Sequence, residues 1–154
     1  MAVLRRWEAQ HRRTLIDPTL AAWEDLDSEV VVRARQHWGL PLPSGLRYWS
    51  RRRYLSVDAA GAPERLIEVQ LLSGHQPAVR ARHSDLLLAG PLGRRYWIYA
   101  LSGAGSGEVL LRTVQDPASA AWVPASPSAA SGDHDPLWLL PLQRVTSAPV
   151  RLAA

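Results

Sequence analysis

The sequence contains no cysteine, no lysine and no phenylalanine among its 154 residues. Without cysteine the chain can form no disulfide, no thiolate zinc site and no cysteine nucleophile, and this composition fits a reducing compartment. All 18 basic residues are arginines. Arginine stays protonated, so it does not replace lysine as a general base or Schiff-base former. These absences exclude catalysis that depends on a cysteine or a lysine side chain.

Long apolar runs are also missing. No stretch approaches 18 consecutive apolar residues, and the first residues, MAVLRRWEAQHRR, lack the apolar centre of a secretory signal. Hydrophobic residues make up 47% of the chain and charged residues 21%, which is typical of a folded domain with a sizeable core. We therefore expect one soluble domain over residues 1–154, located in the cytoplasm and without a membrane partner.

The positive charge lies in the first third of the chain. Residues 1–53 hold ten arginines against six acidic residues, whereas residues 54–154 hold eight of each. The densest stretch is RYWSRRR, at residues 47–53. Arginines contact phosphates and aromatic rings stack on bases, so this stretch predicts nucleic-acid binding through Arg47, Trp49, Arg51, Arg52 and Arg53. The alternative is a solvated strand edge with the tryptophan packed inward.

Residues 1–45 are predicted to form an N-terminal helical segment. Apolar residues over 2–16 fall near one helical face. One or two further helices follow over 18–37, although the run of three valines after Glu29 leaves a short strand as an alternative. Glycines and prolines between 39 and 45 then indicate a loop.

Residues 46–116 carry the strand signals of the predicted core. The end of 46–57 and the run RLIEVQLL at 65–72 flank a turn at 58–63, which predicts a hairpin. A strand over 77–83, a short helix capped by Ser84 and strands at 96–101 and 108–114 follow. Residues 117–136 are rich in Ala, Ser and Pro and predict a loop. Residues 137–154 predict a strand and tail, with Pro141 favouring an edge position over 138–145.

Two further groups are candidate ligand sites. Arg80 and Arg82 precede the predicted helix start, where helix N–H groups can hold a phosphate, so both join the nucleic-acid-binding candidates; ordinary exposed arginines are the alternative. The residues Asp133, His134 and Asp135 are metal-ligating types, but their Ser/Gly/Pro-rich surroundings favour a plain loop.

The order of elements, together with a set of short motifs, resembles a known family. The motifs are Leu55-Ser56, Gly61, Ile67-Glu68-Val69-Gln70, Ser84-Asp85, Tyr96-Trp97-Ile98-Tyr99 and Asp116-Pro117. Over residues 46–120 this set resembles the domain family named after the plant protein NO VEIN, a branch of the PD-(D/E)xK nuclease superfamily. The resemblance implies an α/β (α+β) fold of the restriction-endonuclease type. Its mixed sheet would have a central hairpin, be flanked by helices and follow an N-terminal helical segment.

The resemblance also implies a site, from which this sequence departs. In the superfamily an Asp and a Glu on adjacent strands hold Mg²⁺ or Mn²⁺, and a Lys two residues after the Glu orients water. Here Glu68 matches the Glu and Gln70 replaces the Lys. The Asp position falls at or beside Arg53, and the nearest acid is Asp58.

The predicted turn keeps that acid away from the glutamate. A turn near residues 60–61 pairs Glu68 with about position 53 and Asp58 with about position 63. Asp58 would then lie on the order of 10 Å or more from Glu68 at roughly 3.3 Å per residue. We therefore hypothesise that a salt bridge between Arg53 and Glu68 replaces the metal.

Three functions stay open. The leading one is a catalytically degraded, nucleic-acid-binding domain without a cofactor, serving bacterial DNA maintenance or defence. The second is an active Mg²⁺- or Mn²⁺-dependent DNA endonuclease that uses Asp58, Glu68 and Gln70, with Asp58 and Glu68 as metal ligands. The third is a non-enzymatic subunit that uses the fold as a scaffold for a protein partner or a second copy of itself.

Overall fold

The computed structural model describes residues 1–17, 29–39, 53–73, 78–103, 108–125 and 135–153. The described chain is mixed α+β, in agreement with the predicted class. Its contacts divide it into two compact units, Met1–Val69 and Gln70–Ala154. Strand β3 (Pro63–Leu71) begins in the first unit and ends in the second. None of the described helices is long and apolar enough to cross a membrane.

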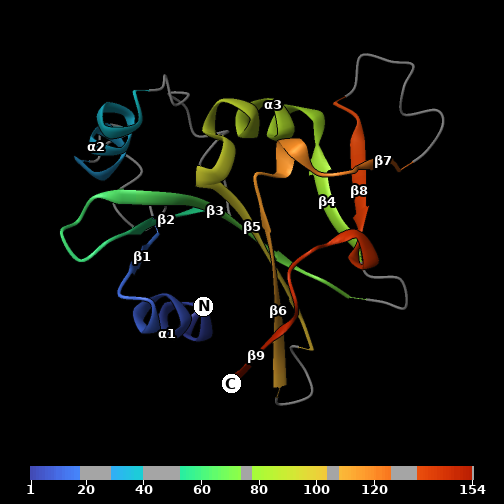
Figure 1. Cartoon of the computed structure of the whole chain (residues 1–154), viewed down its shortest axis with the longest axis horizontal. Coiled ribbons are helices and arrows are strands. Elements are labelled where there is room, and N and C mark those ends of the chain that lie inside the picture. Colours follow the sequence, from blue (N-terminus) through green and yellow to red (C-terminus); the bar gives the residue numbers. More distant parts are fainter. Residues whose placement is uncertain (18–28, 40–52, 74–77, 104–107, 126–134, 154) are drawn as a thin grey trace. The chain divides into compact units, whose positions relative to one another are not determined.

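The first unit pairs three strands in antiparallel order. Strand β2 (Arg53–Val57) lies between β1 (Thr14–Ile16) and β3, and helix α1 (Ala2–Gln10) precedes β1 (Figure 1). The prediction of a helix over 2–16 is therefore wrong beyond residue 10. Arg12 takes a left-handed backbone conformation with φ 58°, which a helix does not tolerate. The chain after it extends and pairs with β2.

Helix α2 (Glu29–Trp38) confirms the helical prediction for that part of 18–37 and excludes the alternative strand after Glu29. The indole Nε1 of Trp38 donates a hydrogen bond of 3.0 Å to the carbonyl oxygen of Pro63. This bond fixes the end of α2 against the start of β3. Residues 18–28 lie outside the described part of the chain.

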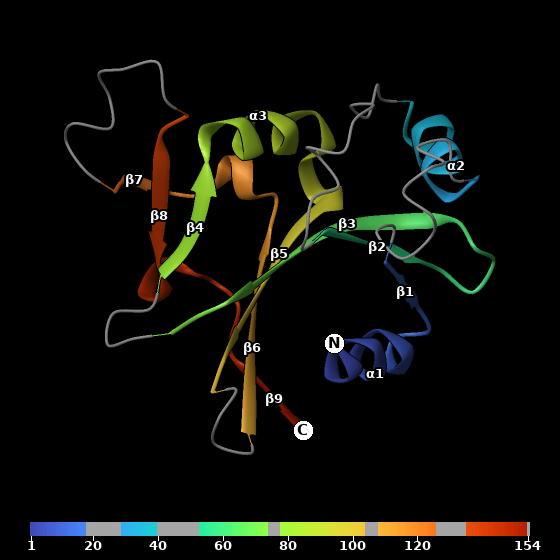
Figure 2. The same ribbon diagram turned by 180° about the vertical axis from the view of Figure 1, so that it is seen from behind.

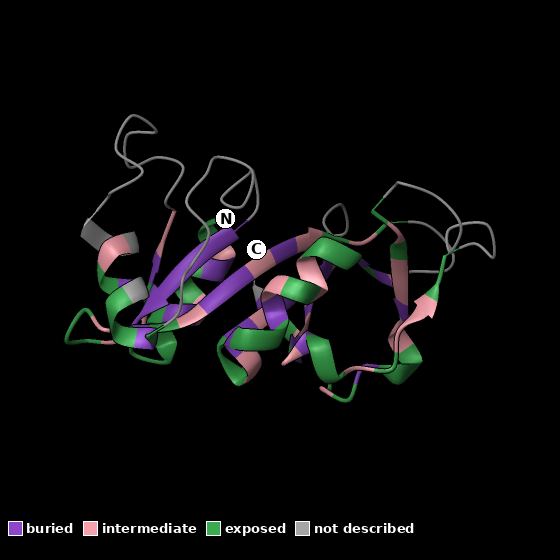
Figure 3. Ribbon diagram, turned by 90° about the horizontal axis from the view of Figure 1, so that it is seen from above, coloured by how far each residue is buried: buried purple, intermediate pink, exposed green. Residues whose placement is uncertain are grey.

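The predicted hairpin is confirmed as β2 and β3. Its register places Arg53 opposite Glu68, as the sequence predicts. An irregularity between Ser56 and Val57 shifts the pairing, so that Val57 rather than Asp58 lies opposite Pro63. Every residue of β2 is buried, and Figure 3 shows this strand buried along its length. The hairpin is therefore the core of the first unit.

The second unit contains two groups of antiparallel strands. In one, β6 (Glu108–Gln115) lies between β5 (Tyr96–Ser102) and β9 (Val150–Ala153). In the other, β8 (Leu137–Pro141) lies between β4 (Ala78–Arg82) and β7 (Val123–Pro124) (Figure 2). Helix α3 (His83–Leu92) directly follows β4, and short 3-10 turns occupy Gly93–Arg95, Pro117–Ser119 and Leu142–Arg144.

Strand predictions at 77–83, 96–101 and 108–114 are confirmed, whereas four predictions in the second unit are wrong. The strand predicted at the edge, β8, is central; Pro141 stands at its last position, opposite Ala78. The predicted tail contains β9, and the predicted loop over 117–136 contains a 3-10 turn and β7. The cap of α3 is Arg82 rather than Ser84.

Candidate functional site

Glu68, the acid of the implied nuclease motif, faces an arginine. Arg53 Nη2 lies 3.8 Å from Glu68 Oε2, and their side chains are only 9% and 15% exposed. The antiparallel register brings the two together, because their Cα atoms are direct partners across β2 and β3. The predicted ion pair is thus confirmed. A positive charge in this sheltered place disfavours a second cation beside the same carboxylate.

Asp58 serves the turn of the hairpin. Its Oδ1 accepts hydrogen bonds from the backbone N–H groups of Ala60 and Ala62, at 2.9 and 2.8 Å. This arrangement is an Asx-type turn, the usual role of an aspartate at the start of a tight loop. Gly61 completes the turn with φ 80°, a conformation that glycine adopts without strain.

Gln70 is engaged with the backbone of β4 in the second unit. Its Oε1 accepts a 2.9 Å hydrogen bond from the N–H of Arg80, and its Nε2 donates one to the Arg80 carbonyl oxygen. The amide thereby acts as both donor and acceptor to one residue, as a neighbouring strand would. Lysine has no acceptor, so it cannot reproduce this pair of bonds.

These placements do not fit a metal ion held jointly by Asp58 and Glu68. Asp58 follows the end of β2, five positions after the residue that faces Glu68, or on the order of 15 Å along a strand. Two oxygens on one Mg²⁺ ion lie within about 5 Å of each other. Within the described ranges, no group of three or more His, Asp or Glu residues is placed to hold a metal.

Arg80 and Arg82 are both exposed on β4. Alternate residues of a strand point to one face, so the two guanidinium groups share a face, while Val79 and Ala81 are buried on the other. The structure therefore offers two of the predicted nucleic-acid contacts as one short basic row. Arg47, Trp49, Arg51 and Arg52 lie outside the described residues.

The start of α3 is occupied by carboxylates of the protein itself. Asp85 Oδ2 accepts the N–H of Arg82 at 3.1 Å, and Asp135 accepts both the N–H and the hydroxyl of Ser84. Burial alone would raise the pKa of Asp135, but these Ser84 hydrogen bonds and the charges of Arg82 and His83 lower it. A phosphate at this helix end would have to displace Asp135. Asp133 and His134, the other members of that candidate metal group, lie outside the described residues.

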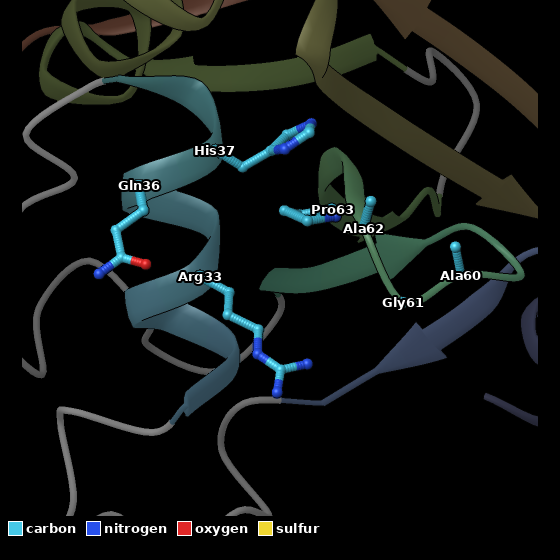
Figure 4. A pocket seen from close by; sticks show the side chains of 7 residues that line it. All are labelled: Arg33, Gln36, His37, Ala60, Gly61, Ala62 and Pro63. Atoms are coloured by element: carbon cyan, nitrogen blue, oxygen red, sulfur yellow. The ribbon is translucent and has the colours of Figure 1, made fainter.

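A groove beside the hairpin turn was not anticipated from the sequence. It has a volume of about 450 Å³ and lies between α2 and residues 60–63. Figure 4 shows Arg33 and His37 extending toward the turn side of α2, whereas Gln36 points away from it. The spacing of four residues between Arg33 and His37, which puts both on one helical face, was the available signal.

Comparison with protein-family models, with the curated proteins and with solved structures gives no match for this chain, so the resemblance to the NO VEIN family stays a prediction.

Proposed function

We propose that this chain is a catalytically degraded, restriction-endonuclease-like domain, similar to those of the NO VEIN family, that binds nucleic acid. We expect it to work in the bacterial cytoplasm, in DNA maintenance or defence. The observation that carries the proposal is the ion pair between Arg53 and Glu68. The superfamily pattern has a metal-binding aspartate at the place where this chain has the arginine.

The proposed loss of catalysis is supported by the three motif positions taken together. Glu68 is paired with Arg53, Asp58 holds the hairpin turn, and the amide of Gln70 is bonded to the backbone of Arg80. Each side chain thus has a structural role. The nuclease alternative requires these same groups to converge on one metal and one water.

Nucleic-acid binding is supported by charge. The chain carries a net charge of +4, with its arginine excess in residues 1–53. Arg80 and Arg82 add an exposed basic row on β4. Arginines in such rows neutralise phosphates and release counterions, which makes binding fall steeply with salt.

The binding test measures the affinity of the chain for a short DNA duplex and for a single strand at a series of salt concentrations. Each phosphate contact removed should lower the slope of log K against log salt by about 1. We expect the double variant Arg80→Gln, Arg82→Gln to lose about 2 in slope, and Arg51→Gln, Arg52→Gln a similar amount.

The matched control is Arg151→Gln, since that arginine is 78% exposed on β9 and lies outside both sets. Absence of binding at low salt would overturn the nucleic-acid proposal and leave the scaffold function. A plasmid and single-strand cleavage assay with Mn²⁺ tests the degraded site. Cleavage that Glu68→Ala abolishes would instead establish the nuclease.

A further inference from the structure

The second unit contains a cavity of about 280 Å³ that plays no part in the proposed nucleic-acid binding. It lies between the end of β6, residues 119–121 and the segment after β8. Three of the residues that line it are buried and apolar: Val114, Leu140 and Val145. Several of the other lining residues are polar and more exposed, and they include a carboxylate, Asp116, and a guanidinium, Arg144.

The carboxylate is held in place by its own loop. Asp116 follows β6 in a left-handed conformation with φ 51°, and its N–H donates a 3.0 Å hydrogen bond to the carbonyl oxygen of Tyr96. Its Oδ2 accepts a 2.9 Å hydrogen bond from the hydroxyl of Ser119. Buried Pro117, whose carbonyl accepts the indole N–H of Trp122, secures the same loop. The acid is therefore positioned before any ligand arrives.

The guanidinium is held by the same wall of the cavity. Arg144 Nη1 donates a 3.3 Å hydrogen bond to the carbonyl oxygen of Ala121. This single bond uses one of the five N–H donors of the guanidinium. Among the interactions of the described residues, Asp116 and Arg144 do not form an ion pair with each other. The cavity thus presents two opposite charges that are each hydrogen-bonded to the surrounding loop and not ion-paired with each other.

We propose that this cavity binds a small zwitterion, a free α-amino acid with a short apolar side chain. The ligand's ammonium group would meet Asp116, its carboxylate would meet Arg144, and its side chain would rest on Val114, Leu140 and Val145. The volume lies near the lower limit of small-molecule sites, which run from roughly 300 to 1,000 Å³. A site of this size takes a single amino acid rather than a peptide or a nucleotide.

The test titrates the full chain with alanine, valine and leucine and follows backbone amide shifts by NMR. Isobutylamine, which has only the ammonium, and isovalerate, which has only the carboxylate, are the paired analogues. We expect saturable shifts at residues 113–121 and 140–146 for at least one amino acid. Each single-charge analogue should bind at least about tenfold more weakly, since each lacks one charge-assisted contact.

Variants separate the two charges. Asp116→Asn keeps a residue that tolerates the left-handed conformation and an oxygen for Ser119, but removes the charge. Arg144→Gln removes the other charge. Each should weaken binding at least about tenfold, and Ala120→Leu should weaken it by filling the space. The control Arg151→Gln removes an arginine on β9, outside the lining residues.

The proposal is overturned by the absence of saturable shifts up to 50 mM amino acid, or by binding that the charge variants leave unchanged. Equal binding of valine and isobutylamine would likewise contradict the role of Arg144. Should Asp116→Asn unfold, the Arg144 variant and the analogue series still decide the outcome. Because no nucleic acid enters this experiment, its failure is independent of the proposed nucleic-acid binding.

Discussion

Glu8 has no exposed surface, although it carries a carboxylate. Arg13 Nε donates to its Oε2 at 2.7 Å, and the hydroxyl of Ser56 donates to the same oxygen at 2.6 Å. These bonds join α1, the residue before β1 and the buried strand β2. A buried charge is tolerated where it is paired and hydrogen-bonded, so this cluster fixes the N-terminal helix against the hairpin.

We predict that Glu8→Gln lowers the free energy of unfolding by roughly 3 kcal/mol, because replacing one charge of a buried ion pair by a neutral amide is strongly destabilising. Arg13 Nε also lies 3.9 Å from Glu64 Oε2, but the Glu64 side chain is 44% exposed. Urea unfolding measures the change. Ser56→Ala is the matched comparison and should cost about 1 kcal/mol, the value of one hydrogen bond. Equal losses in the two variants would contradict the role of the charge.

Gln70 allows a test of what the amide side chain contributes at this position. We predict that Gln70→Lys lowers the free energy of unfolding by about 1 kcal/mol, because lysine cannot accept the hydrogen bond from the Arg80 N–H. Amide hydrogen exchange at Arg80 should accelerate, since its N–H loses the acceptor. The exchange rate of Val79 serves as the internal reference. Unchanged protection at Arg80 would show that the amide bonds do not hold this strand.

Among the elements, helix α3 is stabilised at its start by a residue that lies far away in the sequence. The N–H and hydroxyl of Ser84 are bonded to Asp135, 51 residues later. The pKa of Asp135 is lowered from its usual value of 3.8. A carboxyl group with a lower pKa in the folded state stabilises it above the unfolded pKa. That contribution is lost as the pH falls below about 4 through the folded-state pKa.

We therefore predict that Asp135→Asn costs about 1 kcal/mol or less at pH 7, a small value because the group is exposed and screened. Below pH 4, the stability of the variant should also fall less steeply than that of the wild type. Urea unfolding at a series of pH values from 2.5 to 7 measures both effects. Parallel pH profiles for the two proteins would rule out the assigned role of this carboxylate.

Elements with local signals were predictable, and their partners were not. The β-branched, apolar run of β3 and the Asp58–Pro63 turn specify a hairpin within a short stretch of chain. By contrast, the apolar spacing over residues 2–16 predicts a helix where β1 forms. This spacing carries no information about the left-handed backbone conformation of Arg12, which ends the helix. Strand β8 pairs with β4, whose residues lie some 60 positions earlier. Pairing over such separations depends on tertiary packing rather than on local propensity.

The candidate site was predictable to the same extent. Opposition of Arg53 and Glu68 followed from counting residues across a short turn, since the strand period fixes the register. The partners of Gln70 and Asp135 could not be inferred, because both bond to segments that only the folded chain brings near. The cavity at Asp116 and Arg144 likewise joins residues with no shared sequence pattern.

At the scale of the whole molecule, the net positive charge decides how a nucleic-acid-binding experiment must be designed. A chain with a net charge of +4 attracts nucleic acid without specific contacts, so affinity at one salt concentration is uninformative. The change in salt slope between matched arginine variants is the quantity that separates a binding surface from this background. For metals, the informative quantity is the change in the free energy of unfolding. It rises only when the metal binds the folded chain more tightly than the unfolded chain.

Global unfolding can therefore test whether Arg53 stands in place of a metal. We predict that 5 mM Mn²⁺ leaves the unfolding free energy of the wild type unchanged. Arg53→Asp places a second carboxylate directly opposite Glu68, so that variant should be destabilised in EDTA by like-charge repulsion.

Adding Mn²⁺ should return roughly 1–3 kcal/mol to the Asp variant, the range expected when a ligand exceeds its dissociation constant up to about 100-fold. The control Arg53→Gln removes the arginine without adding a ligand and should gain nothing from Mn²⁺. Stabilisation of the wild type by Mn²⁺, lost in Glu68→Ala, would mean that the glutamate still holds a metal. That result would favour the alternative of an active metal-dependent nuclease.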